Sequence, residues 1–318
     1  MDSHGKFLKR NTHFLFNGSE RLEVDGLGRS SSELIREEIE RKSKIFKDEG
    51  KLSIDYVPKK LVHREKELKL LTAFFKPVIS DHRRFSQRVV ISGPVGVGKT
   101  AIARRFGQDI VEVARERGVR LSYVHVNCRK EKTGFQVISR VLKEFMPSLP
   151  KRGLSLQELL HILADSLKEN DGHLILTLDE VDVLVKTSGP ELLYDLTRLF
   201  EEDVEHERRL SLILIMKEPH IVRSLLEPSI DSTLMHNEIR LSKYNEQQLF
   251  DILKARITEE EAFYEGVVSD SVLRMIACTA SKKGDARYAI EILWRAGKYA
   301  DLEGGDEVLP EHVRRAIA

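Results

Sequence analysis

The stretch GPVGVGKT at residues 93–100 decides the fold that we expect for this chain. It matches the pattern Gly-x-x-x-x-Gly-Lys-Ser/Thr, whose backbone N–H groups cradle phosphates. The apolar run RVVIS precedes it at 88–92, and a helical pattern follows it over 99–117. A loop between a strand and the N-terminus of a helix is the arrangement that phosphate binding requires. The sequence therefore predicts a nucleotide site.

Each residue of this loop has a predicted role in holding ATP or ADP. The glycines let the loop turn back toward the phosphates, and Lys99 reaches the β- and γ-phosphate oxygens. The hydroxyl of Thr100 is expected to bind the Mg²⁺ that accompanies the nucleotide. The predicted nucleotide-binding residues of the loop are Gly93, Pro94, Val95, Gly96, Val97, Gly98, Lys99 and Thr100.

A second, acidic element belongs with the loop. The apolar run HLILTLDE at residues 173–180 predicts a strand that ends in Asp179 and Glu180. Asp179 would hold Mg²⁺ through water, and Glu180 is placed to orient the water that attacks the γ-phosphate. We therefore predict a metal site at Thr100 and Asp179, and catalytic roles for Lys99 and Glu180. A buried strand that happens to end in acids is the alternative.

The remaining pattern predicts an α/β fold with a separate helical domain. Short apolar strands alternate with helices within residues 49–242, which indicates a P-loop domain with a central parallel sheet flanked by helices. Residues 243–318 show only helical patterns and are predicted to form a small all-α domain. Residues 1–48 would be an N-terminal extension with a charged helix, which begins at a capping box of Ser30 and Glu33.

Composition limits the classes of protein to consider. The 318 residues carry 52 Lys and Arg against 51 Asp and Glu, so any contact with nucleic acid must be local. The two cysteines, Cys128 and Cys278, stand far apart, which favours a reduced intracellular setting without disulfides or a zinc site. No apolar run approaches the length of a membrane span. We expect no membrane partner and a cytoplasmic, nucleoid-associated protein.

These motifs together resemble the AAA+ ATPases. Within them, the chain is similar to the archaeal replication initiators that are related to the origin-recognition complex and the cell-division-control helicase loader. The resemblance covers about residues 45–318. The segments that carry it are IDYVPKKLVHREKEL at 54–68, VNCRKEKTGFQVISRVL at 126–142, LDEVDVL at 178–184 and GDARYAI at 284–290. It implies an AAA+ base domain, and the helical domain would be its lid.

The resemblance also implies roles for single residues. Val57, Pro58 and Arg64 would line the adenine and ribose pocket, although a plain loop before a helix is the alternative. Arg287 would reach from the lid to the γ-phosphate and report its presence, a catalytic and nucleotide-binding role, unless it is a surface charge. The implied function is a slow ATPase that binds origin DNA and helps to load the replicative helicase under control of ATP and ADP. Duplex DNA, the helicase and a paralogous initiator would be its partners.

The sequence departs from the family in two places. Lys217 stands where the family usually has a polar sensor residue, often Asn. The family usually carries arginines in a later segment, and one of them can act as a finger on a neighbour's nucleotide. In this chain the corresponding residues are Ser229, Ile230 and Asp231. Because such a finger contributes orders of magnitude in rate, we expect binding to survive and turnover to be slow. Arg208 and Arg209 could substitute, although a solvated charge pair is the simpler interpretation.

A local basic segment bears on DNA binding. Residues 128–152 contain seven basic and two acidic residues, in a region that often contacts duplex DNA in this family. Such a segment could supply salt-dependent phosphate contacts, and a solvated helix face is the alternative. The residues that we expect to contact DNA are Arg129, Lys130, Lys132, Arg140 and Lys143.

Two other interpretations of the chain stay open. Members of the family usually continue into a winged-helix domain, which is absent from this sequence, so we expect weak DNA binding from it alone. The lid segment 241–318 has 11 basic and 14 acidic residues and offers no basic replacement. The chain could instead be a regulatory ATPase that acts on a protein, or a scaffold that holds ADP without turnover.

Overall fold

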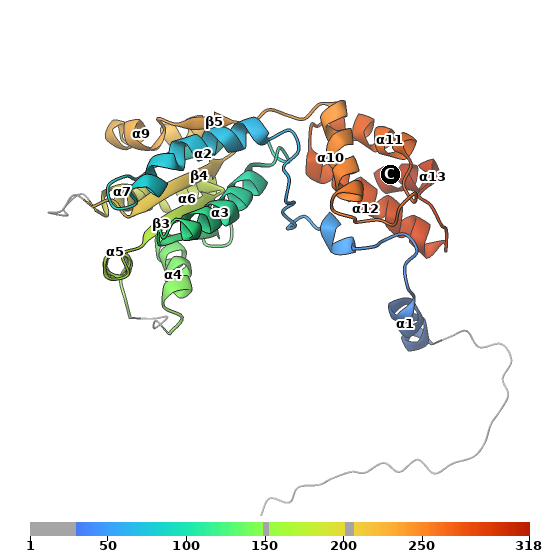
Figure 1. The fold of residues 1–318 in the computed structure, drawn as a ribbon, viewed down its shortest axis with the longest axis horizontal. Coiled ribbons are helices and arrows are strands. Elements are labelled where there is room, and N and C mark those ends of the chain that lie inside the picture. Colours follow the sequence, from blue (N-terminus) through green and yellow to red (C-terminus); the bar gives the residue numbers. More distant parts are fainter. Residues whose placement is uncertain (1–29, 149–152, 201–206) are drawn as a thin grey trace, which may run out of the picture. The chain divides into compact units, whose positions relative to one another are not determined.

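A computed structural model describes residues 30–148, 153–200 and 207–318 (Figure 1). The chain divides into two compact units, Met1–Lys42 and Ser43–Ala318. The described element of the first unit is α1 (Ser31–Glu40), and its predicted capping box is confirmed. The Ser30 hydroxyl accepts a hydrogen bond from the Glu33 N–H, and the Glu33 carboxylate accepts one from the Ser30 N–H. This reciprocal pair satisfies two donors at the start of the helix.

The second unit contains the predicted parallel sheet. Its five strands are β1 (Arg88–Ser92), β2 (Leu121–Asn127), β3 (His173–Asp179), β4 (Leu210–Met216) and β5 (Glu238–Arg240). They lie in the order β2-β3-β4-β1-β5, and every neighbouring pair is parallel. All residues of β3 and β4 are buried, which explains their continuous apolar sequences. The predicted fold class is confirmed.

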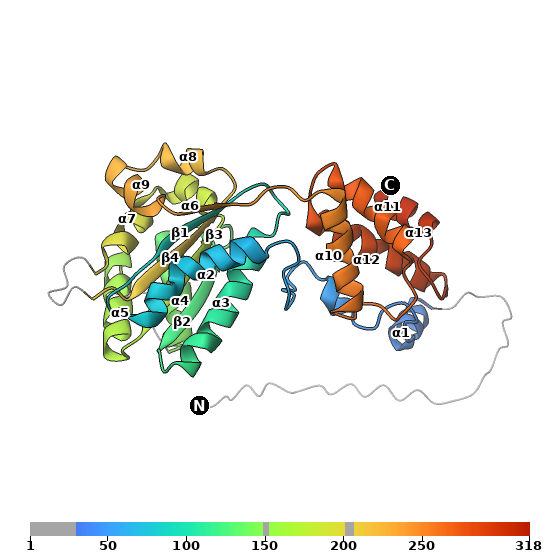
Figure 2. The ribbon, with the colours of Figure 1, turned by 45° about the horizontal axis from the view of Figure 1, so that its top comes forward.

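Helices cover both faces of this sheet (Figure 2). On one face α2 (Glu65–Ser80) and α3 (Lys99–Glu116) pack on alternate strand residues such as Ile175 and Ile213. The other face takes the intervening residues, such as Leu176 and Leu212, against a second group of helices. That group is α4 (Gly134–Phe145), α5 (Leu156–Glu169), α6 (Val181–Ser188) and α7 (Glu191–Arg198). The shorter α8 (Pro219–Arg223) and α9 (Pro228–Leu234) follow β4.

The C-terminal part is all helical, as predicted. It consists of α10 (Glu246–Thr258), α11 (Asp270–Ser281), α12 (Ala286–Leu302) and α13 (Pro310–Ile317). These helices share a core of their own, distinct from the two cores of the sheet. In the described part of the chain, no helix combines the length and apolar character that crossing a membrane demands.

The lid core also contains residues from the start of the unit. Ile45, Phe46 and Leu52 are buried in it, the last on the short helix η1 (Glu49–Leu52). The ring centroids of Phe46 and Phe263 lie 5.0 Å apart. Residues 43–52 therefore pack with the lid, although α2, which covers the sheet, follows them in the chain. The predicted domain boundaries at 48/49 and 242/243 stay predictions.

Candidate nucleotide-binding site

The glycine-rich loop lies between β1 and α3, as the pattern predicts. Gly93 has a φ of 142°, and a Cβ on it would lie 2.4 Å from the carbonyl oxygen of Leu241. Gly98 caps α3 in the left-handed conformation, with φ 92° and ψ 15°. Only glycine adopts these conformations without strain. The loop therefore turns so that the N-terminus of an 18-residue helix opens into it.

Lys99 is held on the inside of this loop. Its ammonium nitrogen donates to the carbonyl oxygens of Gly93 and Pro94, each at 2.6 Å. Burial lowers the pKa of Lys99, while the neighbouring carboxylate of Asp179 acts against that shift. Phosphate oxygens of a nucleotide would offer this partly buried cation the negative charge that the two carbonyls lack.

Asp179 and Thr100 meet at the carboxyl edge of the sheet. The Thr100 hydroxyl donates to Asp179 Oδ2 at 2.7 Å, and His125 Nε2 lies 3.3 Å from the same oxygen. Burial raises the pKa of Asp179, but the contacts with His125 and Thr100 outweigh it and leave the pKa below its ordinary value. Asp179 is therefore an ionised carboxylate beside a hydroxyl.

This pair of oxygen donors fits Mg²⁺. The ion prefers hard oxygen ligands and usually takes one or two from the protein and the others from water and phosphates. Within residues 30–148, 153–200 and 207–318, no cluster of three or more His, Cys, Asp or Glu side chains could form a complete metal site. A divalent ion at Thr100 and Asp179 would thus depend on the nucleotide for further ligands.

Glu180 follows in an unusual conformation. It has φ 60° and ψ 46°, which is left-handed and strained for a residue with a side chain, and such strain clusters at functional sites. Its Oε1 accepts from Asn127 at 3.3 Å, and its Oε2 accepts from Arg129 Nε at 2.7 Å. The Arg129 Nη2 lies 2.6 Å from Oε2 as well. The predicted catalytic carboxylate, Glu180, and a predicted DNA contact, Arg129, are therefore ion-paired.

The start of α12 touches the loop. The Ala286 N–H donates to the Gly96 carbonyl oxygen at 3.1 Å. Asp285 caps the helix by accepting from the N–H groups of Arg287 at 2.8 Å and Tyr288 at 3.2 Å. Arg287 is exposed and borders the same polar hollow as Lys99, Asp179 and Glu180. The structure thus brings this predicted lid residue to the loop.

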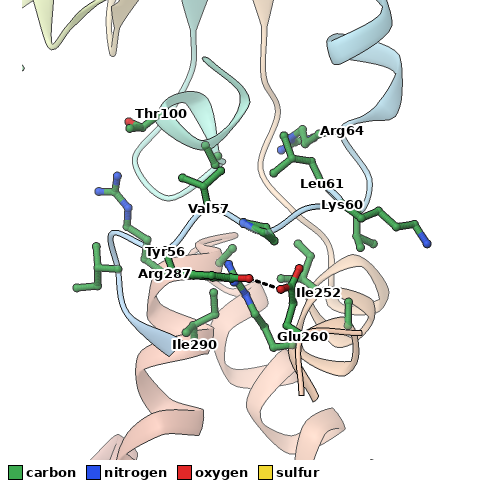
Figure 3. Close-up of a pocket in the computed structure, with 18 of the residues that line it drawn as sticks. Tyr56, Val57, Lys60, Leu61, Arg64, Thr100, Ile252, Glu260, Arg287 and Ile290 are labelled. Atoms are coloured by element: carbon green, nitrogen blue, oxygen red, sulfur yellow. Dashed lines mark hydrogen bonds between the residues drawn. The ribbon is translucent and has the colours of Figure 1, made fainter. Parts of the chain in front are cut away.

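An apolar pocket adjoins the polar hollow (Figure 3). Val57 and Pro58 line it from the segment before α2, while Ile252 and Ile290 line it from the lid. Tyr56 reaches across to Glu260 and donates its hydroxyl hydrogen to the carboxylate (Figure 3). The size and apolar character of such a pocket suit a purine ring.

Arg64 lines this pocket, and most of its hydrogen bonds go to backbone carbonyl oxygens. Its Nε donates to the Val97 carbonyl at 3.0 Å and its Nη2 to the Ser242 carbonyl at 2.9 Å. The guanidinium lies 4.0 Å from the ring centroid of Tyr244, and the residue is only 3% exposed. Arg64 therefore braces the loop against the segment that leads into the lid.

The other residues predicted to contact DNA differ in their surroundings. Arg140 pairs with Glu144 at 2.5 Å on α4. Lys130, Lys132 and Lys143 are exposed and form no ion pair with any residue of the described ranges. Lys151 and Arg152, which complete the basic count, lie outside the described residues.

The interpretation of Arg208 and Arg209 as a solvated pair is wrong for Arg209, whereas Arg208 is exposed. Arg209 is 3% exposed and binds Glu207 at 2.7 Å and Asp171 at 3.0 Å. It precedes β4, at the end of the strand opposite Lys217, so it holds that far edge together. Neither arginine borders the nucleotide site.

Sequence reasoning missed several residues of the site. Asn127 ends β2 beside Asp179 in the sheet register, a position that the strand pattern alone could have indicated. Tyr56, Tyr244 and Glu260 carry no motif, because their contacts exist only once the lid has folded against residues 53–64.

This fold and site define an AAA+ P-loop protein. Residues 83–225 match the family described as an AAA domain, and residues 250–318 match the Cdc6 AAA+ ATPase-type lid domain. The "ORC1-type DNA replication protein 2" of Saccharolobus solfataricus is 36% identical over 292 residues, 90% of this chain and 70% of the relative. The chain therefore belongs to the family of ORC1-type DNA replication proteins.

Solved structures agree with this assignment. The Aeropyrum pernix ORC1 protein, solved in complex with DNA, is 34% identical with a TM-score of 0.78 over 87% of this chain and 70% of that one. The Aeropyrum pernix ORC2 protein, solved as ADPNP-ADP complexes, is 24% identical with a TM-score of 0.79 over 86% of this chain and 72% of that one, and shows the same fold. The chain spans about two thirds of the length of the curated relatives it matches, 66–70% for the first three.

Proposed function

We propose that this chain binds ATP and ADP with Mg²⁺ and uses the nucleotide state to control its binding to origin DNA and its part in helicase loading. One observation carries the proposal. The phosphate loop, the acid pair (Asp179 and Glu180) and the start of the lid helix α12 meet at one site. The Ala286–Gly96 hydrogen bond joins the helix to the loop, and Arg287 borders the polar hollow that contains the acid pair. A lid that touches the phosphate loop can transmit the state of the nucleotide.

The residues of the nucleotide site would have separate roles in ATP binding and hydrolysis. The loop N–H groups and Lys99 would hold the phosphates, while the apolar pocket between Val57 and Ile290 would take the base. Thr100 and Asp179 would hold Mg²⁺, which supplies positive charge to the β- and γ-phosphate oxygens. Glu180 would orient the attacking water and accept its proton, after its carboxylate leaves Asn127 and Arg129.

Arg287 would bind the γ-phosphate and so respond to its presence. It lies on the lid, whereas the loop and the acid pair lie on the sheet, so a bond from Arg287 to this phosphate would fix the lid on the base domain. Release of the γ-phosphate would remove that bond and leave the weaker Ala286–Gly96 contact. The angle between lid and base would then differ between ATP and ADP.

DNA binding would use the basic surface of residues 129–143. Lys130, Lys132 and Lys143 are exposed without ion-pair partners in the described part of the chain, so phosphates could bind them without displacing a carboxylate. Arg129 and Arg140 would have to exchange Glu180 and Glu144 for a phosphate. The complex of the Aeropyrum pernix ORC1 protein with DNA supports DNA binding as such, whereas the choice of this surface rests on the exposure and charge of its residues.

Fluorescence anisotropy with labelled duplex DNA tests the proposal. Origin and scrambled duplexes are titrated at several salt concentrations with ADP or a non-hydrolysable ATP analogue. We expect affinity that falls steeply with salt, because phosphate contacts release counterions, and that differs between the two nucleotides. Equal affinity with both nucleotides would refute nucleotide control, and no binding at low salt would refute DNA binding by this chain.

A second function is favoured by the bonds of Glu180. Both of its carboxylate oxygens are already engaged, one by Asn127 and one by Arg129, so the chain could hold ADP without turnover and act as a scaffold for a protein partner. Purification with one equivalent of ADP and no phosphate release would favour this function. Measurable release of phosphate would exclude it.

A further inference from the structure

Two polar side chains of β2 lie beside Asp179 on the sheet. Tyr123 and His125 share the face that α3 covers with Asp179 of β3, because alternate residues of a strand point to the same side. His125 is paired with Thr177, two residues before Asp179. The His125 side chain is 11% exposed, and its Nε2 lies 3.3 Å from Asp179 Oδ2, the oxygen that also accepts from Thr100.

The Nε2 of His125 is a buried nitrogen whose bonding is incomplete. Within the described residues it has no partner with the alignment of a hydrogen bond, and the Asp179 carboxylate is its ion-pair contact. A buried polar group without a hydrogen bond costs free energy, so its presence needs a reason. Hydrogen bonds in a functional site are often long without the ligand and tighten when it binds. A small turn of Asp179 would complete this bond.

The ring hydrogen of His125 lies on the nitrogen that faces Asp179. An ionised carboxylate only accepts hydrogen bonds, so Nε2 has to donate. The other nitrogen, Nδ1, is then an acceptor, and the Tyr123 hydroxyl lies 3.4 Å from it. Burial raises the pKa of Tyr123, so this hydroxyl keeps its hydrogen and can donate it. Tyr123, His125 and Asp179 therefore form a chain in which each group donates to the next.

Tyr123 is fixed in place by α3. A Cβ on Gly107 would lie 2.3 Å from Tyr123 Cζ, so the ring packs directly on the backbone of the helix. Glycine weakens a helix interior relative to alanine, and at this position it makes room for the ring. The same helix presents Thr100 from its first turn. It therefore holds both ends of the chain, with Thr100 on Asp179 and Gly107 against Tyr123.

We propose that Tyr123 and His125 position the Asp179 carboxylate for the Mg²⁺ of a bound nucleotide. This role rests on the proposed function, because it requires Mg²⁺ at Thr100 and Asp179. Tyr123 and His125 border neither the polar hollow nor the apolar pocket, so they act through Asp179 alone. The Thr100 hydroxyl and the His125 N–H restrain one carboxylate oxygen together. Such outer contacts orient a metal-binding carboxylate and raise its affinity for the ion.

Five proteins test this role: wild type, His125→Phe, His125→Gln, Tyr123→Phe and the control His82→Phe. Phenylalanine keeps a ring without an N–H, whereas the amide of glutamine can still donate to Asp179. The control also changes a partly buried histidine beside a carboxylate, because His82 Nε2 lies 3.4 Å from Asp171 Oδ1. It lies at the far edge of the sheet and borders neither space. Circular dichroism checks that each variant folds.

Titration with fluorescent ADP gives the affinity in Mg²⁺, the affinity in EDTA and the ratio of the two. We expect His125→Phe to lose about tenfold in this ratio and to keep its affinity in EDTA within about twofold, because the contact serves the metal ligand. Tyr123→Phe should lose about threefold in the ratio, since His125 stays but loses its donor. His125→Gln should recover most of the ratio, and His82→Phe should match wild type.

Equal losses of affinity in Mg²⁺ and in EDTA would make the role of His125 structural and overturn the inference. The wild-type ratio in His125→Phe would overturn it as well. If His125→Phe does not fold, Tyr123→Phe decides in its place, and the wild-type ratio there overturns the inference. If wild type gains no affinity from Mg²⁺, the proposed magnesium site fails, and the positioning role fails with it.

Discussion

Lys99 is a partly buried cation at the place where the loop pattern predicts a phosphate. Two carbonyl oxygens at 2.6 Å hold it, and burial lowers its pKa in spite of the nearby Asp179 carboxylate, so the phosphates of a nucleotide would add to the charge compensation. We expect Lys99→Ala to weaken ATP binding by about a hundredfold, roughly 3 kcal/mol, as measured by calorimetric titration. Lys76→Ala, which changes an exposed lysine of α2, should leave the affinity unchanged. Equal affinities of both variants would refute the site.

Arg129 restrains Glu180 through the ion pair at 2.6 Å. Removal of the guanidinium should free the carboxylate to orient water, so we expect Arg129→Ala to raise the single-turnover rate several-fold at low salt. Lys130→Ala is the matched control, because its side chain is a neighbouring exposed cation without a contact to Glu180. A double change, Arg129→Ala with Glu180→Gln, should show no turnover. A fall in rate in Arg129→Ala alone would mean that the arginine assists hydrolysis.

Some residues of the site could be predicted from a local sequence pattern, whereas others can be recognised only in the folded structure. Lys99, Thr100, Asp179 and Glu180 stand within contiguous motifs, so their neighbours along the chain indicate their environment. The restraint on Glu180 comes from Arg129, 51 positions away, and only the pairing of β2 with β3 brings the two together. The positive charge of Arg129 in a basic segment led to the prediction that it contacts DNA. The same sequence features could not show that the Glu180 carboxylate lies beside it at the end of the neighbouring strand β3.

At the scale of elements, the fit of α12 on the loop depends on Gly96. A Cβ there would lie 1.8 Å from Asp285 Oδ1, and its φ is 76°. Gly118 has a φ of 72° with nothing within 4 Å, so Gly118→Ala carries the same backbone strain, about 1 kcal/mol, without the clash. We expect Gly96→Ala to speed amide exchange over 284–290 and weaken ATP binding, whereas Gly118→Ala should do neither. Equal exchange in both variants would show that the lid contact is not tight.

Arg287 extends the same helix toward the hollow. If it reads the γ-phosphate, Arg287→Ala should leave ADP affinity nearly unchanged and reduce preference for the ATP analogue by about tenfold, since one charge contact is lost. The affinities come from fluorescent-nucleotide titration. Arg295→Ala, on the same helix and paired with Glu291 at 2.5 Å, is the control. A similar loss for both nucleotides in Arg287→Ala would argue for a general electrostatic role.

Most elements could be predicted because their sequences satisfy local rules. Buried parallel strands need apolar residues on both faces, and capping boxes mark the starts of α1 and α5. Residues 43–52 had no such pattern. Ile45, Phe46 and Leu52 are too few and too irregularly spaced to predict a place in the lid core, which only the complementary surface of α10–α13 creates.

For the whole Ser43–Ala318 unit, the two ends of the sheet have opposite characters. The carboxyl edge holds the loop, the acid pair and Lys217, with cations and acids around an open hollow. The far edge is closed by Arg83 and Arg209 on Asp171, whose pKa these arginines hold well below its usual range. Substitutions at the carboxyl edge should therefore change the rate of ATP hydrolysis, whereas substitutions at the far edge should change the stability of the fold.

The far edge also contains a histidine that should make folding sensitive to acid. His173 is 0% exposed, with Nδ1 2.7 Å from the His82 carbonyl oxygen and Nε2 2.8 Å from the Ser211 hydroxyl. Burial lowers its pKa from 6.5 to about 4. Between these values the unfolded chain binds a proton that the folded chain does not, so the free energy of unfolding should fall as the pH drops, by roughly 3 kcal/mol at most.

Urea unfolding of the nucleotide-free protein between pH 4 and 7.5, followed by circular dichroism, measures this loss. Other groups at this edge are His82, Arg83, Arg209, Glu207 and Asp171. The lowered pKa of Asp171 keeps its carboxylate ionised in the folded protein throughout the range. His173→Gln should unfold more easily at every pH but lose most of the slope, because the titrating group is gone. His161→Gln, which changes an exposed histidine of α5, should keep the wild-type slope. A full slope in His173→Gln would assign the acid sensitivity to another group.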